Sequence, residues 1–191
     1  KLLLKNDMEI TSDFFIDCSG WESLLKEPDK VDLTGRLFCD TAIATRVPYN
    51  DRKTEMKPYV VSRSVDCGWI WEIPIRTRIG SGLVFNKSIT PIEEAKQYLI
   101  KHWDNRITEE DLKVLNWTPY YCKNIWEDNV VSIGLSAGFI EPLESTGLAL
   151  MIDGLQKLQT KIADNTCNNL DKDLYNLEMQ SAFDDCIDFV S

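Results

Sequence analysis

The most regular hydrophobic pattern lies in the last third of the chain. Val130, Val131 and Ile133 form a short apolar run that stops at Gly134, which predicts a buried strand. After Gly147, apolar residues recur at helical spacing. They are Leu148, Met151, Ile152, Leu155 and Leu158. This spacing predicts an amphipathic helix with one face in the core, joined to the strand by a loop that is rich in small residues.

Other segments also have helical patterns. Thr90–Glu93 resembles a capping box with proline in the first turn, and it predicts a helix whose core face holds Ile92, Ala95 and Leu99. Thr108–Asp111 predicts the start of another helix, because acidic residues favour a helix N-terminus. A last amphipathic helix is indicated by Leu170, Leu174, Leu177, Phe183, Ile187 and Val190.

Strand patterns dominate the first 85 residues. Residues 2–10 predict a hairpin, and the unbroken apolar run at residues 14–16 fits a parallel strand that is covered on both faces. Ligands sit at the carboxyl ends of such strands, so residues 18–20 either face a ligand or form a tight turn that needs glycine. Residues 41–47 and 59–61 are also typical of strands.

A period-two alternation of large apolar side chains runs along residues 67–75 and includes Trp69 and Trp71. Gly80-Ser81-Gly82 is predicted to be the turn that sends this strand back into residues 83–85. Together with the helices, these strands predict a mixed α/β (α+β) fold class.

Composition narrows the classes of partner and chemistry. The net charge of −10 argues against nucleic acid and anionic membrane as partners, and no apolar run approaches the roughly 20 residues that span a bilayer. Six dispersed cysteines without a secretory signal indicate reduced thiols, and we expect a cytoplasmic protein. With one histidine, His102, we expect neither a metal site nor a Ser-His-Asp triad.

The segment Glu141-Pro142-Leu143-Glu144-Ser145-Thr146-Gly147 joins the predicted strand to the predicted helix. Ser145 or Thr146 is a natural N-cap, and free backbone N–H groups at a helix start attract an anion. A carboxylate, Glu144, precedes that start directly. The segment is therefore either an ordinary helix cap or a site where the carboxylate and a bound anion act on different chemical groups.

Three motifs in order resemble the flavin-dependent tryptophan halogenases, from about Asp13 to the C-terminus. They are DFFIDCSG at residues 13–20, GWIWEIP at residues 68–74 and GLSAGFIEPLESTG at residues 134–147. The resemblance implies part of a flavin monooxygenase-like FAD-binding fold with an antiparallel sheet and C-terminal helices. We expect one partial domain over residues 1–191: the end of the FAD-binding sheet (1–36), a β-rich and helical insertion (37–128), and the halide and active-site turn with helices (129–191).

The resemblance also implies an activity: chlorination or bromination of an electron-rich aromatic, such as tryptophan or another indole, through hypohalous acid. The implied cofactor is FAD, supplied as FADH2 by a separate flavin reductase, with a halide ion and O2 as co-substrates. A homodimer is left open.

Site residues are implied by the same resemblance. Glu144 matches the catalytic carboxylate, and Ser145 matches the residue whose carbonyl meets the indole N–H, so both are implied catalytic and substrate-binding residues. Thr146 and Gly147 match the halide contacts. The implied cofactor-binding residues are Leu135, Leu148 and Gly20. In the flavin-contacting segment around Gly20, Ser19 stands where related monooxygenases carry Asp, so an acidic contact to the flavin is not implied.

Two parts of the family's machinery have no match in the sequence: the Gly-x-Gly-x-x-Gly turn that binds the pyrophosphate, and the family's lysine. We therefore expect the middle of a halogenase, with one wall of the active site, that binds no flavin tightly by itself. The alternatives are a non-catalytic fragment or binding module derived from a halogenase, and a flavin monooxygenase that inserts oxygen. The paired tryptophans favour the halogenase over the monooxygenase.

Overall fold

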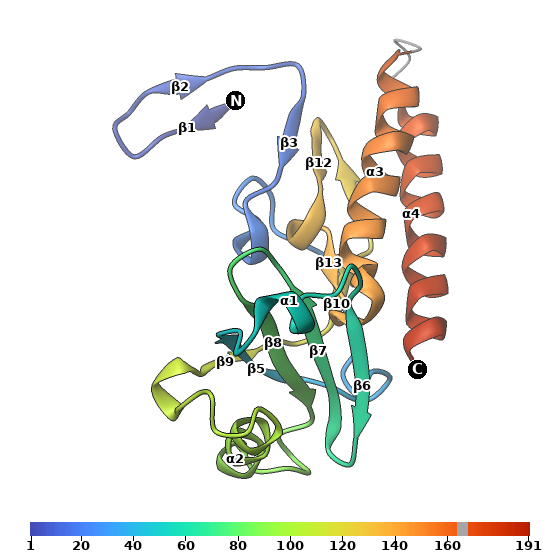
Figure 1. Ribbon diagram of the computed structural model, residues 1–191. Helices are drawn as coiled ribbons and strands as arrows, with labels where there is room; N and C mark the ends of the chain where they lie inside the picture. The colour runs from blue at the N-terminus through green and yellow to red at the C-terminus, as the bar shows by residue number, and fades with distance from the viewer. Residues whose placement is uncertain (164–167) are drawn as a thin grey trace. The chain divides into compact units, whose positions relative to one another are not determined.

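The computed structural model describes residues 1–163 and 168–191 (Figure 1). Its contacts divide the chain into two compact units: unit 1 comprises Lys1–Leu37 and Pro119–Ser191, and unit 2 comprises Phe38–Thr118. The predicted mixed α/β class, with antiparallel sheets and C-terminal helices, is confirmed. The finer division predicted at residues 36–37 and 128–129 stays a prediction.

Unit 1 contains three small sheets. The predicted N-terminal hairpin is confirmed by the antiparallel pairing of β1 (Leu2–Leu3) with β2 (Glu9–Ile10). In the second sheet, β3 (Phe15–Asp17) pairs in parallel with β12 (Val130–Ser132), and β11 (Trp126–Glu127) pairs antiparallel with β12. The third sheet joins β4 (Lys30–Asp32), β10 (Tyr120–Cys122) and β13 (Gly138–Phe139). The apolar run without alternation correctly predicted a parallel strand, but Ile16 is 45% exposed, so the expectation that both faces are covered is wrong.

Two long helices pack against each other in unit 1, α3 (Thr146–Ala163) and α4 (Asn169–Val190) (Figure 1). Their contact is close at Gly154, where the Tyr175 hydroxyl donates to the Gly154 carbonyl at 3.3 Å. Helix α4 begins with a capping box between Asn168 and Asp171. The C-terminal helix predicted from Leu170 onward is thus confirmed. Its predicted apolar face is wrong in part, because Phe183 and Ile187 are buried whereas Leu170, Leu174 and Leu177 are exposed.

The predicted core face of α3 is wrong in part. The helix buries Leu150 and Leu158, whereas Leu148 and Ile152 are 58% and 51% exposed. Apolar residues cover most of the circumference of this helix, so periodicity alone did not identify the buried side. The buried side is the one that carries Gly154, where a methyl group would lie 3.2 Å from the Tyr175 hydroxyl oxygen, so a small residue favours the close approach of Tyr175.

Unit 2 is built on an antiparallel sheet in the order β6-β7-β8-β5-β9. Its strands are β5 (Thr41–Val47), β6 (Val61–Val65), β7 (Gly68–Pro74), β8 (Ile79–Phe85) and β9 (Lys113–Asn116). Helix α2 (Ile92–His102) buries Ala95 and Leu99 in the same core as Ile43 and Leu83. A four-residue helix, α1 (Arg52–Glu55), follows β5.

Two helix starts predicted in unit 2 differ from the structure. Thr108–Asp111 does form a capping box, but it closes a single 3-10 turn, η2 (Glu109–Asp111), and β9 comes next because residues 113–116 pair with β5. At α2, Pro91 rather than Thr90 occupies the N-cap position, and Thr90 is buried. In both places the sequence correctly marks a helical turn, and the surrounding tertiary structure decides its exact start and its length.

The predicted turn at Gly80-Ser81-Gly82 is wrong. All three residues lie inside β8, and the chain reverses earlier, where the Ile75 N–H donates to the Arg78 carbonyl at 2.9 Å. A methyl group at Gly82 would overlap the Trp71 ring and lie 2.5 Å from the Ile43 carbonyl oxygen. Gly82 is therefore small because the indole of Trp71 lies across it.

This geometry predicts different costs for two alanine substitutions in one strand. Gly82→Ala should lower the free energy of unfolding by about 1–3 kcal/mol, the range for overpacking a core site. Gly80→Ala is the matched control, since its methyl group would come no closer than 3.8 Å to another residue, and its effect should stay below about 1 kcal/mol. Urea unfolding of both variants measures the difference, and equal destabilisation would contradict the packing role of Gly82.

Candidate active-site turn

The heptapeptide at residues 141–147 enters helix α3 through a short 3-10 turn, η4 (Leu143–Ser145). Glu144 has φ 52° and ψ 21°, and Ser145 has φ 60°. Both residues therefore lie in the left-handed region, which costs roughly 1–2 kcal/mol for each non-glycine residue. Strain of this kind persists only where the surrounding structure imposes it, and it clusters at functional sites.

Hydrogen bonds within residues 141–146 stabilise the turn. The Thr146 hydroxyl donates to the Glu141 carbonyl at 3.0 Å, and the Ser145 N–H donates to the Pro142 carbonyl at 3.3 Å. Glu141 and Thr146 are both buried. The expectation that Thr146 caps the helix with its side chain is thus wrong: its hydroxyl donates back into the loop, and Thr146 is the first residue of α3.

The geometry at the helix start suits a small anion. The first backbone N–H groups of a helix have no partner within the helix. Ser145 is left-handed and Thr146 is right-handed, with φ −50° and ψ −39°, and such alternation turns successive N–H groups toward one side. Gly147 is exposed, and a methyl group there would meet nothing within 4 Å. Open space therefore adjoins the Gly147 N–H, whereas the Thr146 N–H already donates to the Leu143 carbonyl.

The structure brings four predicted site residues together on this one turn. Glu144, Ser145 and Gly147 are exposed, while Thr146 is buried and its N–H donates to the Leu143 carbonyl. Leu148 follows on the exposed side of α3. The carboxylate of Glu144 and the amides of the helix start are thus adjacent in sequence but belong to side chain and backbone respectively, and this allows them to address different groups.

The other predicted cofactor-binding residues lie in two short loops of unit 1. Gly20 begins η1 (Gly20–Glu22) with φ 83°, and a methyl group there would meet nothing within 4 Å. Leu135 lies in η3 (Gly134–Ser136), where its carbonyl accepts the Tyr120 hydroxyl at 2.6 Å. Burial raises the pKa of Tyr120 to about 12, so this phenol keeps its proton and remains a donor at neutral pH.

Sequence reasoning missed residues that support these loops. Asp17, at the end of β3, is 1% exposed, and Ser136 is fully buried. A carboxylate directly after a predicted buried strand was an available signal for Asp17. No pattern around Ser136 distinguishes it from the other small residues of its loop.

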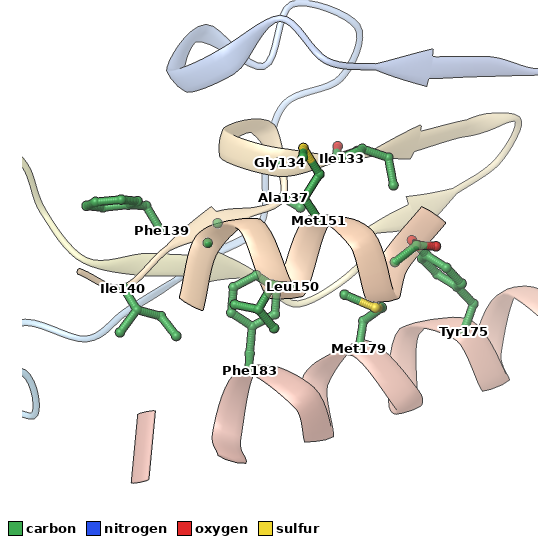
Figure 2. A pocket seen from close by; sticks show the side chains of 14 residues that line it. Ile133, Gly134, Ala137, Phe139, Ile140, Leu150, Met151, Tyr175, Met179 and Phe183 are labelled. Atoms are coloured by element: carbon green, nitrogen blue, oxygen red, sulfur yellow. The ribbon is translucent and has the colours of Figure 1, made fainter. Parts of the chain in front are cut away.

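A cavity of about 10 Å³ lies behind the turn, between α3, α4 and the loop that follows β12 (Figure 2). Its lining includes Gly147, Leu150 and Met151 from α3 and Met179 and Phe183 from α4. This volume accommodates roughly one water molecule. An aromatic substrate therefore has no room in this cavity.

The paired tryptophans lie in unit 2. The ring centroids of Trp69 and Trp71 are 6.0 Å apart, and both rings pack against a small core cluster that includes Ala42 and Val84. A structural role as sheet core accounts for these contacts.

Other chemistry-bearing groups have structural partners. His102 Nε2 lies 3.2 Å from the Glu72 carboxylate, which places the histidine at the end of α2 in an ordinary polar contact. Within residues 1–163 and 168–191, no three His, Cys, Asp or Glu side chains gather as metal ligands would. Cys18, Cys67, Cys122 and Cys186 are free thiols, and Cys167 lies outside the described residues. No helix in the described part of the chain has the length and apolar character of a membrane span.

Comparisons with known proteins agree on one family. The tryptophan halogenase family profile matches residues 1–191. Tryptophan 7-halogenase KtzQ of Kutzneria sp. (strain 744) is 35% identical over 186 residues, which cover 95% of this chain and 35% of that protein. Tryptophan 6-halogenase ThaL of Streptomyces albogriseolus is 32% identical, with 99% of this chain and 36% of that protein covered.

Solved structures of flavin-dependent halogenases also resemble this chain. BrvH, a flavin-dependent halogenase from Brevundimonas sp. BAL3, superposes with a TM-score of 0.88 at 30% identity, covering 98% of this chain and 39% of that chain. The chain spans 35–36% of the length of the two curated relatives named above. On the strength of the profile match along its whole length, this chain belongs to the tryptophan halogenase family.

Proposed function

We propose that this chain forms the halide-binding and substrate-facing wall of a flavin-dependent halogenase that chlorinates or brominates an electron-rich aromatic, with tryptophan or another indole as the substrate class. The observation that carries the proposal is the strained turn of Glu144 and Ser145, which leads into an anion-attracting helix start. The relatives named tryptophan halogenases support the substrate class.

The proposed cofactor is FAD, used in its reduced form and supplied by a separate flavin reductase. The residues present fit one face of a flat ring system, because the space beside Gly20 is open and the side chains of Leu135 and Leu148 are exposed apolar surfaces. When bound, the reduced flavin would supply the electrons with which O2 oxidises the halide to hypohalous acid. Gly20, Leu135 and Leu148 would hold and orient the ring.

The turn itself carries the remaining roles. The amides of Thr146 and Gly147 would hold the halide, since donors at a helix start favour negative charge, and the Thr146 N–H would exchange its present bond to the Leu143 carbonyl for this contact. The Ser145 carbonyl would accept the substrate N–H. Glu144 would orient the hypohalous acid or accept the proton that the ring loses on substitution. Its exposure places this carboxylate on the side where a substrate has room.

Glu144→Gln tests the carboxylate directly. Glutamine keeps the size and the hydrogen bonding of the side chain but removes the charge and the proton acceptor. Halogenation by the protein that carries this segment should fall by about 10²-fold or more, the scale of general acid–base groups. Consumption of reduced flavin should persist, because Glu144 has no part in the oxygen chemistry. Product formation and flavin oxidation are measured side by side.

Glu110→Gln is the control for this experiment, because Glu110 is an exposed glutamate on η2 in unit 2. Glu141 is unsuitable, since it is buried and its carbonyl supports the turn. Halogenation at the parental rate in Glu144→Gln, or loss of flavin oxidation together with halogenation, would contradict the role proposed for Glu144.

A bromide soak tests the halide site. An anion at an exposed helix start gains roughly 0.3–1 kcal/mol, so occupancy should need bromide at about 0.2–0.6 M. Crystals soaked in bromide should show an anomalous peak within contact distance of the Thr146 and Gly147 amides. The start of α4 is an internal control, because the Asn168 side chain already accepts the Asp171 N–H there and the Asp171 carboxylate repels an anion. A peak at α4 and none at α3 would refute the site.

A further inference from the structure

The loop that carries Gly20 is fixed by one buried carboxylate. Asp17 Oδ1 accepts the Ser19 N–H at 2.9 Å and the Ser19 hydroxyl at 2.6 Å. The second carboxylate oxygen, Oδ2, accepts the Leu25 N–H at 3.0 Å. The Ser19 hydroxyl oxygen in turn accepts the Leu24 N–H at 2.8 Å. Because a buried carboxylate is stable only when it is hydrogen-bonded, these bonds tie residues 19–25 to the end of β3.

The backbone of the same residue fixes the loop that carries Leu135. The Asp17 carbonyl accepts the Ile133 N–H at 2.9 Å and the Ser136 hydroxyl at 2.5 Å. The Ser136 carbonyl then accepts the Ser23 hydroxyl at 3.2 Å, so the two loops are also bonded to each other. Ser23 and Ser136 are both buried.

Aromatic contacts close the same assembly. The Trp21 ring, on the loop of Gly20, meets the Phe139 ring edge-on at 5.0 Å between centroids. Trp21 also lies 6.1 Å from Tyr120, whose hydroxyl donates to the Leu135 carbonyl. The loops of Gly20 and Leu135 are thus held together at several points, and Asp17 is the residue that bonds to both through its own atoms.

We propose that Asp17 is a positioning residue for the flavin: it sets the separation and orientation of the Gly20 and Leu135 loops that contact the ring. The inference rests on the proposed function, because it takes these two residues as flavin contacts. Asp17 is 1% exposed and acts from behind the loops. The space beside Gly20 stays open to the ring, since a methyl group there would meet nothing within 4 Å.

Asp17→Asn is the main variant. An asparagine presents one N–H₂ group, which must face either the Ser19 donors or the Leu25 N–H, so at least one loop bond is lost. The dissociation constant for FAD, titrated by flavin fluorescence with the protein that carries this segment, should rise about tenfold or more, as expected for the loss of one charge-assisted hydrogen bond. The visible absorption bands of the bound flavin should shift as well.

Ser19→Ala is a second, milder variant in case Asp17→Asn folds poorly. It removes the hydroxyl donor to Asp17 and the acceptor of the Leu24 N–H, and it should weaken FAD binding in the same direction by a smaller factor. Asp51→Asn is the matched control, because exposed Asp51 accepts the Lys53 N–H at 2.9 Å in a similar local bond in unit 2.

Asn176→Ala controls for stability alone. Buried Asn176 bonds to both the N–H and the carbonyl of Trp126, at 2.7 Å and 2.9 Å, so its loss should lower the melting temperature but leave the FAD affinity of the folded protein unchanged. Parental FAD affinity and absorption in folded Asp17→Asn or Ser19→Ala would overturn the inference and leave the proposed function standing. Absence of FAD binding by the unsubstituted protein that carries this segment would overturn both this inference and the proposed function.

Discussion

Helix α3 can begin at Thr146 only because the two preceding residues adopt left-handed backbone. Glu144 and Ser145 together carry roughly 2–4 kcal/mol of strain. The compensation lies further along the helix, where Leu150 and Leu158 are buried in the core that Tyr175, Met179 and Phe183 of α4 share. Full burial of one such apolar side chain contributes about 1.5–3 kcal/mol, so the packing of α3 on α4 exceeds the strain. Tertiary packing therefore maintains a turn that its local sequence would not adopt.

The strained turn resolves a conflict that the sequence poses. A carboxylate beside an anion site is unfavourable if both face the same point, since two like charges 4 Å apart repel by about 1 kcal/mol even in water. In this turn the negative group belongs to a side chain and the anion-attracting groups belong to the backbone. Because Glu144 is exposed, solvent screens the repulsion between its carboxylate and a bound anion.

Patterns that depend on a single element were read correctly from the sequence. The apolar run at residues 14–16 predicted a parallel strand, and the segment after Gly147 predicted a helix. Features that depend on contact with a second element were not predicted correctly. Periodicity did not show which side of α3 faces α4, because apolar residues occupy both sides. Gly82 resembled a turn residue. The structure shows instead that a glycine is needed there because the indole of Trp71, eleven positions earlier in the chain, lies across it. Thr108 carries a true capping box, and the pairing with β5 ends that helix after one turn.

The candidate site depends on the same distinction. The motif at residues 141–147 is contiguous, so the sequence alone indicated the turn and its residues. The network around Asp17 is not contiguous, because Ser136 lies 119 positions away and meets Asp17 only through the parallel pairing of β3 with β12. That pairing has a second consequence. The segment from Gly134 to Gly147 is anchored at its start, where the Ser136 hydroxyl donates to the Asp17 carbonyl. The bond from the Thr146 hydroxyl to the Glu141 carbonyl lies within the segment, so it sets the local shape of the turn, while the pairing of β3 with β12 sets the position of the Leu135 loop.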